Sequence, residues 1–194
     1  MNARDHLILA AEKVFHDFGY RRANIGDVSR AAGVSRQGLY HHFRNKPELF
    51  RAVIAKAHAD TVNKSAQARD AARARGADYE TVVAAMIDER FGQMLRDLQK
   101  TPHAVEIFEE ATKRCADLIL AQTIRFNDLL LELTQSEIES GRLKLAAGLS
   151  IDTLLMAFMT MARGVSLMQP PVPPARLRDE YARHIHLLMH GARA

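Results

Sequence analysis

The chain lacks the sequence features of disulfide-bonded, membrane-spanning and secreted proteins. Its one cysteine, Cys115, can form no intramolecular disulfide bond, so the fold does not depend on oxidation, which fits a reducing cytosol. The most apolar stretch, residues 149–168, includes Asp152 and Arg163, and both charges are costly at the depth of a bilayer. No signal-peptide pattern precedes the first amphipathic segment. We therefore expect a cytoplasmic protein without a membrane partner.

Signatures of catalysis are also scarce. No serine lies in a Gly-x-Ser-x-Gly pattern, no glycine-rich phosphate loop occurs, and nothing near Cys115 marks it as an activated nucleophile. Glu106, Glu109 and Glu110 are close in sequence, but acids on helices are usually solvated. We expect no enzyme activity and no cofactor.

Metal binding has equally weak support. His41 and His42 are adjacent, so on a helix they point apart and make a poor pair of ligands. His186 and His190 are four residues apart, but no third ligand accompanies them. We expect an exposed helix face there rather than a metal site.

Positive charge is concentrated at the start of the chain. The net charge is +4, and residues 1–50 hold eight Lys and Arg against five Asp and Glu, while the remainder is nearly balanced. A basic module suggests a polyanionic partner, although small domains often reach this charge by chance.

Apolar residues recur at helical spacing along the chain, and the alternation typical of strands is absent. The sequence therefore predicts an all-α fold. Asn24 and Ser35 are expected to cap the second and third helices, and the run Asn45-Lys46-Pro47-Glu48 is expected to open the fourth. The first helix should end at Gly19. The residues expected on its inner face are Leu7, Ala11, Val14, Phe15 and Phe18.

Residues 58–77 are polar and rich in alanine, and we interpret them as the junction between a domain at 1–50 and a domain at 51–194. Beyond the junction, Asp78 is expected to cap a helix that Thr101-Pro102 ends. The further helices expected are a short one with Val105, Ile107 and Phe108, a long one at about 113–139 that Gly141 ends, and two at about 150–168 and 175–190, separated by the proline-rich run 169–174.

The segment with the most information is residues 25–43. Two short helices joined by a turn that contains Gly33 describe a helix-turn-helix. In the second helix Leu39 and Phe43 are four residues apart and face inward, which leaves an outward arc of polar side chains. Arginine and glutamine can pair with guanine and adenine edges, while tyrosine and histidine can donate to phosphate oxygens. The arc consists of Arg36, Gln37, Tyr40 and His41.

Plainer interpretations stay open for three of these residues. Arg36 and Gln37 can be solvated side chains of a short helix. Tyr40 can be a half-buried core residue with only its hydroxyl in water.

Residues 7–54 resemble the DNA-binding domain of the TetR family of repressors, over about a quarter of the chain. The resemblance implies a dimeric repressor of about nine helices, with a three-helix N-terminal domain, a C-terminal ligand pocket and the last two helices in the dimer. The matching stretches are Leu7-Ile8-Leu9-Ala10-Ala11, Phe18-Gly19-Tyr20, Ile25-Gly26-Asp27-Val28-Ser29-Arg30-Ala31-Ala32-Gly33-Val34-Ser35, Gly38-Leu39-Tyr40-His41-His42-Phe43 and Asn45-Lys46-Pro47-Glu48-Leu49.

The resemblance also implies which residues face DNA. Lys46, with the free amides that begin its helix, would hold a phosphate. Gly26 departs from the family, where a larger residue is usual, and it would loosen its helix by about 1 kcal/mol relative to alanine. The DNA-facing residues implied are Ser35, Arg36, Gln37, Tyr40, His41, His42 and Lys46.

The sequence says less about a ligand. Methionines and phenylalanines recur after residue 80 and suit an adaptable binding surface, but ordinary core packing also explains them. Arg90, Gln122 and Arg163 interrupt apolar stripes, so each needs a partner, which is either an internal acid such as Glu106 or Asp128 or a ligand. Long apolar walls favour a hydrophobic or amphipathic effector. The candidate contacts are Phe91, Met94, Gln122, Phe126, Met159 and Arg163.

The helix at 150–168 is apolar almost all round, which is more than one subunit core needs. We therefore expect a symmetric homodimer through the last two helices. We also expect effector binding to shift the short helix after Pro102 and, with it, the fourth helix, so that the recognition helices lose the spacing that DNA requires. The surface expected on the last helix consists of Leu177, Tyr181, Ile185, Leu188 and Met189.

Together these features predict a regulator that binds double-stranded operator DNA and is released by a small-molecule effector. The alternative is a ligand-independent DNA-organising dimer whose second domain only dimerises. A helical enzyme would need a converging acid–base or metal site, and the sequence offers none.

Overall fold

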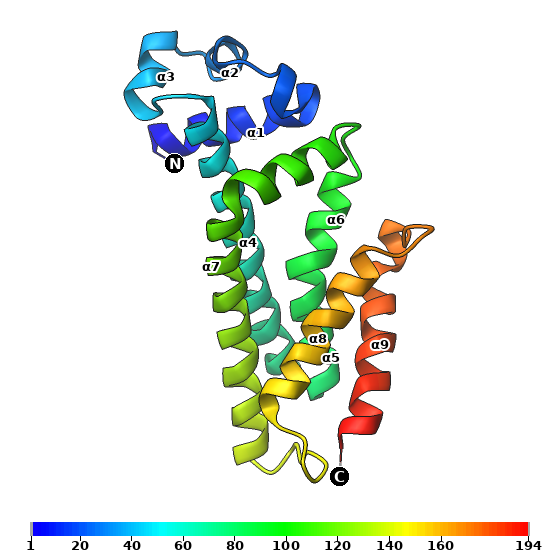
Figure 1. The fold of residues 1–194 in the computed structure, drawn as a ribbon. Helices are drawn as coiled ribbons and strands as arrows, with labels where there is room; N and C mark the ends of the chain where they lie inside the picture. Colours follow the sequence, from blue (N-terminus) through cyan, green and yellow to red (C-terminus); the bar gives the residue numbers. More distant parts are fainter. Residues whose placement is uncertain (1, 194) are drawn as a thin grey trace. The chain divides into compact units, whose positions relative to one another are not determined.

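A computed structural model describes residues 2–193, apart from the side chain of Leu98, and these residues form an all-α structure (Figure 1). The expected fold class is therefore confirmed, and none of the described residues lies in a strand. The helices are α1 (Ala3–Arg22), α2 (Ile25–Ala31), α3 (Arg36–His42), α4 (Lys46–Ala74), α5 (Tyr79–Ile87), α6 (Gln93–Leu98), α7 (Ala104–Glu139), α8 (Ile151–Ser166) and α9 (Leu177–Ala192), with a π-helical turn at Asp88–Gly92 and a 3-10 turn at Pro174–Arg176.

The chain packs as two units. The first unit holds the residues up to Ala59 together with Asp97–Ala121, and the second unit holds Asp60–Arg96 together with Gln122–Ala194. α4 and α7 each contribute residues to both units. The division into a DNA-binding domain at 1–50 and a ligand-binding domain at 51–194 stays a prediction about function.

The N-terminal helices begin and end where the sequence predicts. Asn24 and Asp27 form a reciprocal capping box at the start of α2, and Ser35 Oγ accepts a hydrogen bond from the Gly38 amide at the start of α3. Gly19 adopts a φ of 73°, a conformation that costs glycine little and other residues much. Phe18 was expected to face inward, and this was wrong, because its side chain is 49% exposed.

The structure refines two expected boundaries. Residues 58–74, interpreted from sequence as a domain junction, are helical and form the second half of α4, because alanine, glutamine, lysine and arginine are strong helix formers. The short helix after Pro102 and the long helix behind it follow one another within α7, where a kink separates them in place of a loop. A break remains inside α7 at Cys115, where φ is −130° and ψ is 19°.

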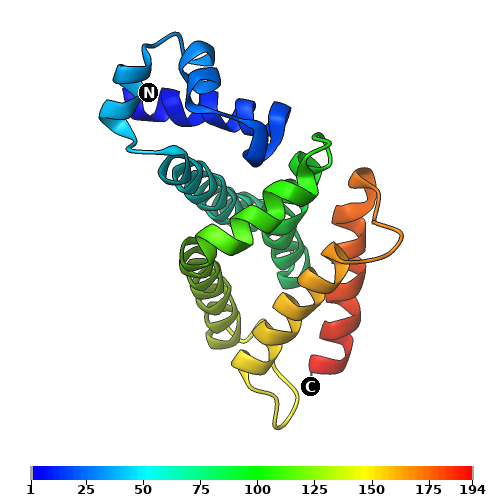
Figure 2. The ribbon, with the colours of Figure 1, turned by 45° about the horizontal axis from the view of Figure 1, so that its top comes forward.

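In the second unit α9 lies alongside α5 and α8 (Figures 1 and 2). The residues expected on the dimer surface of α9 were largely wrong, because Leu177, Tyr181, Ile185 and Met189 are buried within this packing. The exposed apolar residues of α8 and α9 are instead Met156 and Leu187, at 69% and 64% exposure. The helical spacing of the sequence correctly predicted an apolar face on α9. It did not show that this face packs against α5 and α8 of the same chain rather than against a second subunit.

No helix in the described part of the chain combines the length and the apolar character that crossing a lipid bilayer requires.

Candidate nucleic-acid interface

The helix-turn-helix lies within the first unit. α2 packs against α1 on one side and α3 on the other. The turn between α2 and α3 is closed by a hydrogen bond of 3.0 Å from the Val34 amide to the Ser29 carbonyl, and Gly33 supplies the positive φ of 66° that the turn requires. His6 from α1 also hydrogen-bonds the Ala32 carbonyl at 3.0 Å. The turn is therefore fixed by a hydrogen bond within it and by a second one from α1.

α3 separates its side chains into two faces, as the sequence predicts. Leu39 and Phe43 are 0% exposed and anchor the helix to the core of the first unit. Tyr40 is 51% exposed, so more of it than its hydroxyl is open to solvent. Arg36, Gln37 and His41 are also exposed, and His42 is half-buried. The outward face of α3 is thus polar and open to a partner.

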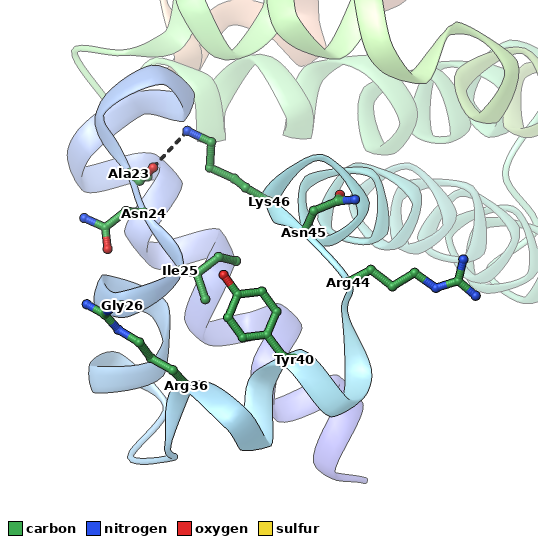
Figure 3. A pocket seen from close by; sticks show the side chains of 9 residues that line it. All are labelled: Ala23, Asn24, Ile25, Gly26, Arg36, Tyr40, Arg44, Asn45 and Lys46. Carbon is green, nitrogen blue, oxygen red and sulfur yellow. Dashed lines mark hydrogen bonds between the residues drawn. The ribbon is translucent and has the colours of Figure 1, made fainter.

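A hollow of about 530 Å³ opens beside this face (Figure 3). Three of its lining residues carry a positive charge, and none is acidic. A cationic hollow with amide and hydroxyl donors around it has the chemistry that binds a phosphate oxygen. The lining residues are Ala23, Asn24, Ile25, Gly26, Arg36, Tyr40, Arg44, Asn45 and Lys46.

Gly26 fixes the place of the Arg36 guanidinium. A Cβ atom at position 26 would lie 2.5 Å from Nη2 of Arg36 and 3.0 Å from its Nε. The guanidinium therefore occupies the space that a larger residue would fill, against the first turn of α2, as Figure 3 shows. This contact gives a physical reason for the glycine that departs from the family pattern.

Lys46 has a different role from a free surface lysine. Its ammonium donates to the carbonyl oxygens of Tyr20 at 2.9 Å, Arg21 at 3.3 Å and Ala23 at 3.0 Å. It also lies 4.6 Å from the centre of the Tyr20 ring. A cation at the carbonyl end of a helix is favourable, so Lys46 joins α4 to the end of α1 while its charge still contributes to the hollow.

Of the predicted DNA-facing residues, the hollow brings together Arg36, Tyr40 and Lys46. Gln37 and His41 lie outside the hollow on the exposed face, and Ser35 uses its hydroxyl to cap α3. The ring of His42 stands edge-on to that of His41 at 5.4 Å. The role of all seven residues in binding DNA stays a prediction.

Sequence reasoning missed four residues here. Asn24, Arg44 and Asn45 line the hollow, and the guanidinium of Arg4 lies 4.7 Å from the centre of the Phe43 ring. The basic Arg44 directly after the core residue Phe43 was the available signal. Arg4 could not be found in this way, because forty residues of sequence separate it from the ring that it covers.

The first half of α7 is tied to α1 by polar and charged contacts within the first unit. The Arg21 amide donates to Glu106 at 2.6 Å, and the Arg21 side chain reaches Glu110 at 3.5 Å. A hydrogen bond from Arg114 is the main cause that lowers the pKa of Glu110. Thr101 adds a hydrogen bond of 2.6 Å to the His16 carbonyl.

α4 carries a second such tie. Arg51 binds both carboxylate oxygens of Asp117, at 2.9 and 2.7 Å. Its hydrogen bonds are the main reason that the pKa of Asp117 falls to about 2.

The predicted ligand contacts all belong to the second unit but are not all brought together. Phe91 and Phe126 meet edge-to-face with ring centres 5.9 Å apart, and Met159 is buried in the same core. Gln122 is half-buried and accepts a hydrogen bond from Arg125 at 3.2 Å. Met94 is half-buried, whereas Arg163 is exposed on α8.

Residues 7–53 match the family described as "Bacterial regulatory proteins, tetR family". The activator FasR of Mycolicibacterium smegmatis is 42% identical over 59 residues, which cover 30% of this chain and 26% of FasR. The repressor BepR of Brucella suis is 35% identical over 54 residues, which cover 28% of this chain and 26% of BepR. The aligned segments thus span about a quarter of each relative.

The likeness of fold extends over the whole chain. The solved structure of the transcriptional regulator FadR from Bacillus subtilis in complex with stearoyl-CoA has a TM-score of 0.69 and 17% identity, and the match covers 96% of this chain and 98% of that one. Both curated relatives are named as transcriptional regulators rather than as enzymes. The segment 7–53 of this chain thus resembles the DNA-binding segment of the TetR family of bacterial regulatory proteins, and the chain shares the fold of FadR.

Proposed function

We propose that the protein is a cytoplasmic transcriptional repressor that binds operator DNA as a homodimer and is released by a small effector. The observation that carries the proposal is the outward face of α3 beside a cationic hollow without acidic residues. This pairing supplies base-reading side chains and a phosphate contact within one small module.

The side chains of the interface divide into two roles. Gln37 is exposed near the start of α3 and is placed to read a base edge, where a good contact discriminates by about 1–3 kcal/mol. Tyr40 lines the hollow and is suited to a phosphate oxygen. Arg36 can serve either role, because it lines the hollow and its side chain is exposed.

The sense of regulation rests on the family, whose members include both the activator FasR and the repressor BepR. Repression needs only that the bound dimer occludes a promoter, so it is the simpler function for a chain of this size. The FadR structure with stearoyl-CoA supports a small effector with a long apolar part. The candidate contacts Phe91, Phe126 and Met159 would line its site.

The dimer is proposed to form through the outer faces of α8 and α9. Met156 and Leu187 expose large apolar side chains there, and Thr160 and Gly164 offer a small surface along α8. A substitution such as Met156→Asp should then favour monomers in light scattering, while Arg75→Asp, at an exposed position outside α8 and α9, serves as a comparison. A symmetric dimer would place its two α3 helices about 34–36 Å apart, or within reach of that spacing.

Release is proposed to pass through α7. Its first half is bound to α1 by Glu106 and Glu110. Its second half binds Arg51 of α4 through Asp117 and contributes Phe126 to the second unit. The break at Cys115 lies between these halves. An effector that binds the DNA-incompetent state more tightly would shift this helix, and operator DNA would weaken effector binding by the same factor.

The experiment that tests the function is selection of binding sites from random double-stranded DNA with the full-length protein, followed by footprinting. An enriched two-fold symmetric site with a protected half-site for each α3 supports the proposal. A ligand-independent DNA-organising dimer would instead protect DNA without an enriched sequence, and that result would replace the proposed function.

A further inference from the structure

Arg90 is the largest side chain of the second unit to be almost fully buried, at 2% exposure. It lies in the π-helical turn at Asp88–Gly92 between α5 and α6. Such turns insert one extra residue into a helix and occur often at functional sites, because the locally weakened hydrogen-bond ladder re-aims a side chain.

The guanidinium of Arg90 has few partners in this environment. Nη1 donates to the Thr61 hydroxyl at 3.2 Å, and the group lies 5.3 Å from the centre of the Phe91 ring. Nε is closed off from solvent and has no hydrogen-bond partner. No carboxylate among the described residues forms an ion pair with this guanidinium, which is unusual because a buried charge is normally paired.

Burial is the cause that lowers the pKa of Arg90, to about 10. The group therefore remains protonated at neutral pH, so the interior of the second unit holds a positive charge without its counter-ion.

Glu89 is adjacent to Arg90 in sequence, but no ion pair joins the two among the described contacts, and Asp88, two residues before Arg90, is committed elsewhere. Asp88 accepts a hydrogen bond of 2.8 Å from Nη1 of Arg96. Gly92 allows this pair to form, because a Cβ atom at that position would overlap with Oδ1 of Asp88. The turn thus satisfies Asp88 with one arginine and leaves the other, Arg90, without an acid.

Phe91, beside Arg90, packs against the apolar core of the second unit. The ring of Phe91 meets the ring of Phe126 at 5.9 Å, and Met86 and Phe126 are both 0% exposed. A guanidinium offers parallel N–H groups that match the two oxygens of a carboxylate or of a phosphate group. A molecule with one anionic end and an apolar remainder would pair with the Arg90 guanidinium and pack against these apolar side chains.

We propose that Arg90, assisted by Thr61, binds the anionic head group of an effector whose remaining part is apolar and lies against Phe91 and Phe126. The inference rests on the proposed effector-controlled regulation and specifies the chemical class of the effector. Because Nε of Arg90 is closed off from solvent, binding requires a shift of the side chains beside it. The π-helical turn is the part of the backbone that can move most easily to allow this shift.

The test uses the full-length protein and four ten-carbon probes: decanoate, decyl phosphate, 1-decanol and decyltrimethylammonium. Calorimetric titration below the micelle concentration of each probe should show that an acid binds at least about tenfold more tightly than the alcohol, since charge-assisted hydrogen bonds exceed neutral ones. The cationic probe should bind more weakly than the alcohol. The two acids distinguish a carboxylate head group from a phosphate one.

Variants assign the preference to Arg90. Arg90→Gln should abolish the difference between acid and alcohol, Arg90→Lys should retain part of it, and Thr61→Val should reduce it. Arg75→Gln is the matched control, because Arg75 is an exposed arginine of the same unit. Circular dichroism tests whether each variant is folded. If Arg90→Gln is not folded, Arg90→Lys and Thr61→Val still test whether this site produces the preference for acid over alcohol.

The inference is overturned if neither acid binds at millimolar concentration, or if acid and alcohol bind equally to the wild-type protein. It is also overturned if a folded Arg90 variant keeps the full preference. Binding of operator DNA without any probe is measured in parallel. Intact operator binding with no acid preference would remove this inference alone, whereas loss of specific operator binding would remove the proposed function.

Discussion

The helix-turn-helix and the core of the second unit differ in how their polar groups are satisfied. In the helix-turn-helix, Asn24, Ser35 and Asn45 cap helices through partners three residues away, and Lys46 is held by three backbone carbonyls. In the second unit, Arg90 Nε and Asn127 Oδ1 are buried without a hydrogen-bond partner. This difference fits the two proposed roles, since a surface that reads DNA can be complete before its partner arrives, whereas a site for a small molecule can retain unsatisfied polar groups until the molecule binds.

The largest expected effect comes from removing the inward anchor of the recognition helix. Phe43→Ala should destabilise the protein by about 3–5 kcal/mol, because a fully buried phenylalanine is lost, and operator binding should fall with it. Denaturant unfolding measures the change. Phe18→Ala is the matched control, and a similar loss of stability in both variants would contradict the assigned faces, since Phe18 is half exposed.

Asn24→Ala tests whether local caps hold the recognition module. The loss of the reciprocal cap with Asp27 should cost about 1 kcal/mol of stability. Hydrogen exchange should show the increased opening at α2 and α3 and not at α8. Uniform loss of protection along the chain would show that the two regions do not differ in this respect.

Gly26→Ala separates helix stability from DNA binding. Alanine should stabilise α2 by about 0.5–1 kcal/mol, because glycine is a poor helix former. The new Cβ should displace the Arg36 guanidinium, so operator affinity should fall while the melting temperature rises. If affinity is unchanged, the position of Arg36 against α2 does not matter for recognition.

The smallest effect concerns the tie between Arg51 and Asp117. The folded pKa of Asp117, about 2, lies below its ordinary value of 3.8, so the tie stabilises the protein above pH 4 and is lost as the pH falls toward 2. The melting temperature of Asp117→Asn should therefore lie below that of the wild-type protein at pH 7 and approach it in acid. Glu139→Gln, at an exposed position, should show no such convergence.

The helix-turn-helix could be predicted from sequence because its signals are local. The capping residues Asn24 and Ser35 and the spacing of Leu39 and Phe43 lie within twenty residues, and all four behave as expected. The two halves of α7 were expected from sequence, but the exact position of the break at Cys115 was not, because no glycine or proline marks it.

The environment of Arg90 was only partly predictable. Its interruption of an apolar stripe indicated that it needs a partner, but the suggested acids Glu106 and Asp128 are not its partners. Its neighbour Thr61 lies 29 residues away, and periodicity cannot identify a contact between distant segments.

The central claim is that the outward face of α3 reads DNA, and it is tested most directly by binding a randomised operator library to the wild-type protein, Gln37→Ala and Tyr40→Phe. The account predicts that Gln37→Ala relaxes the preference at one base position in each half-site. It predicts that Tyr40→Phe weakens all sequences about equally and leaves the preferences intact. Affinity and preference that are unchanged in both variants would contradict the account.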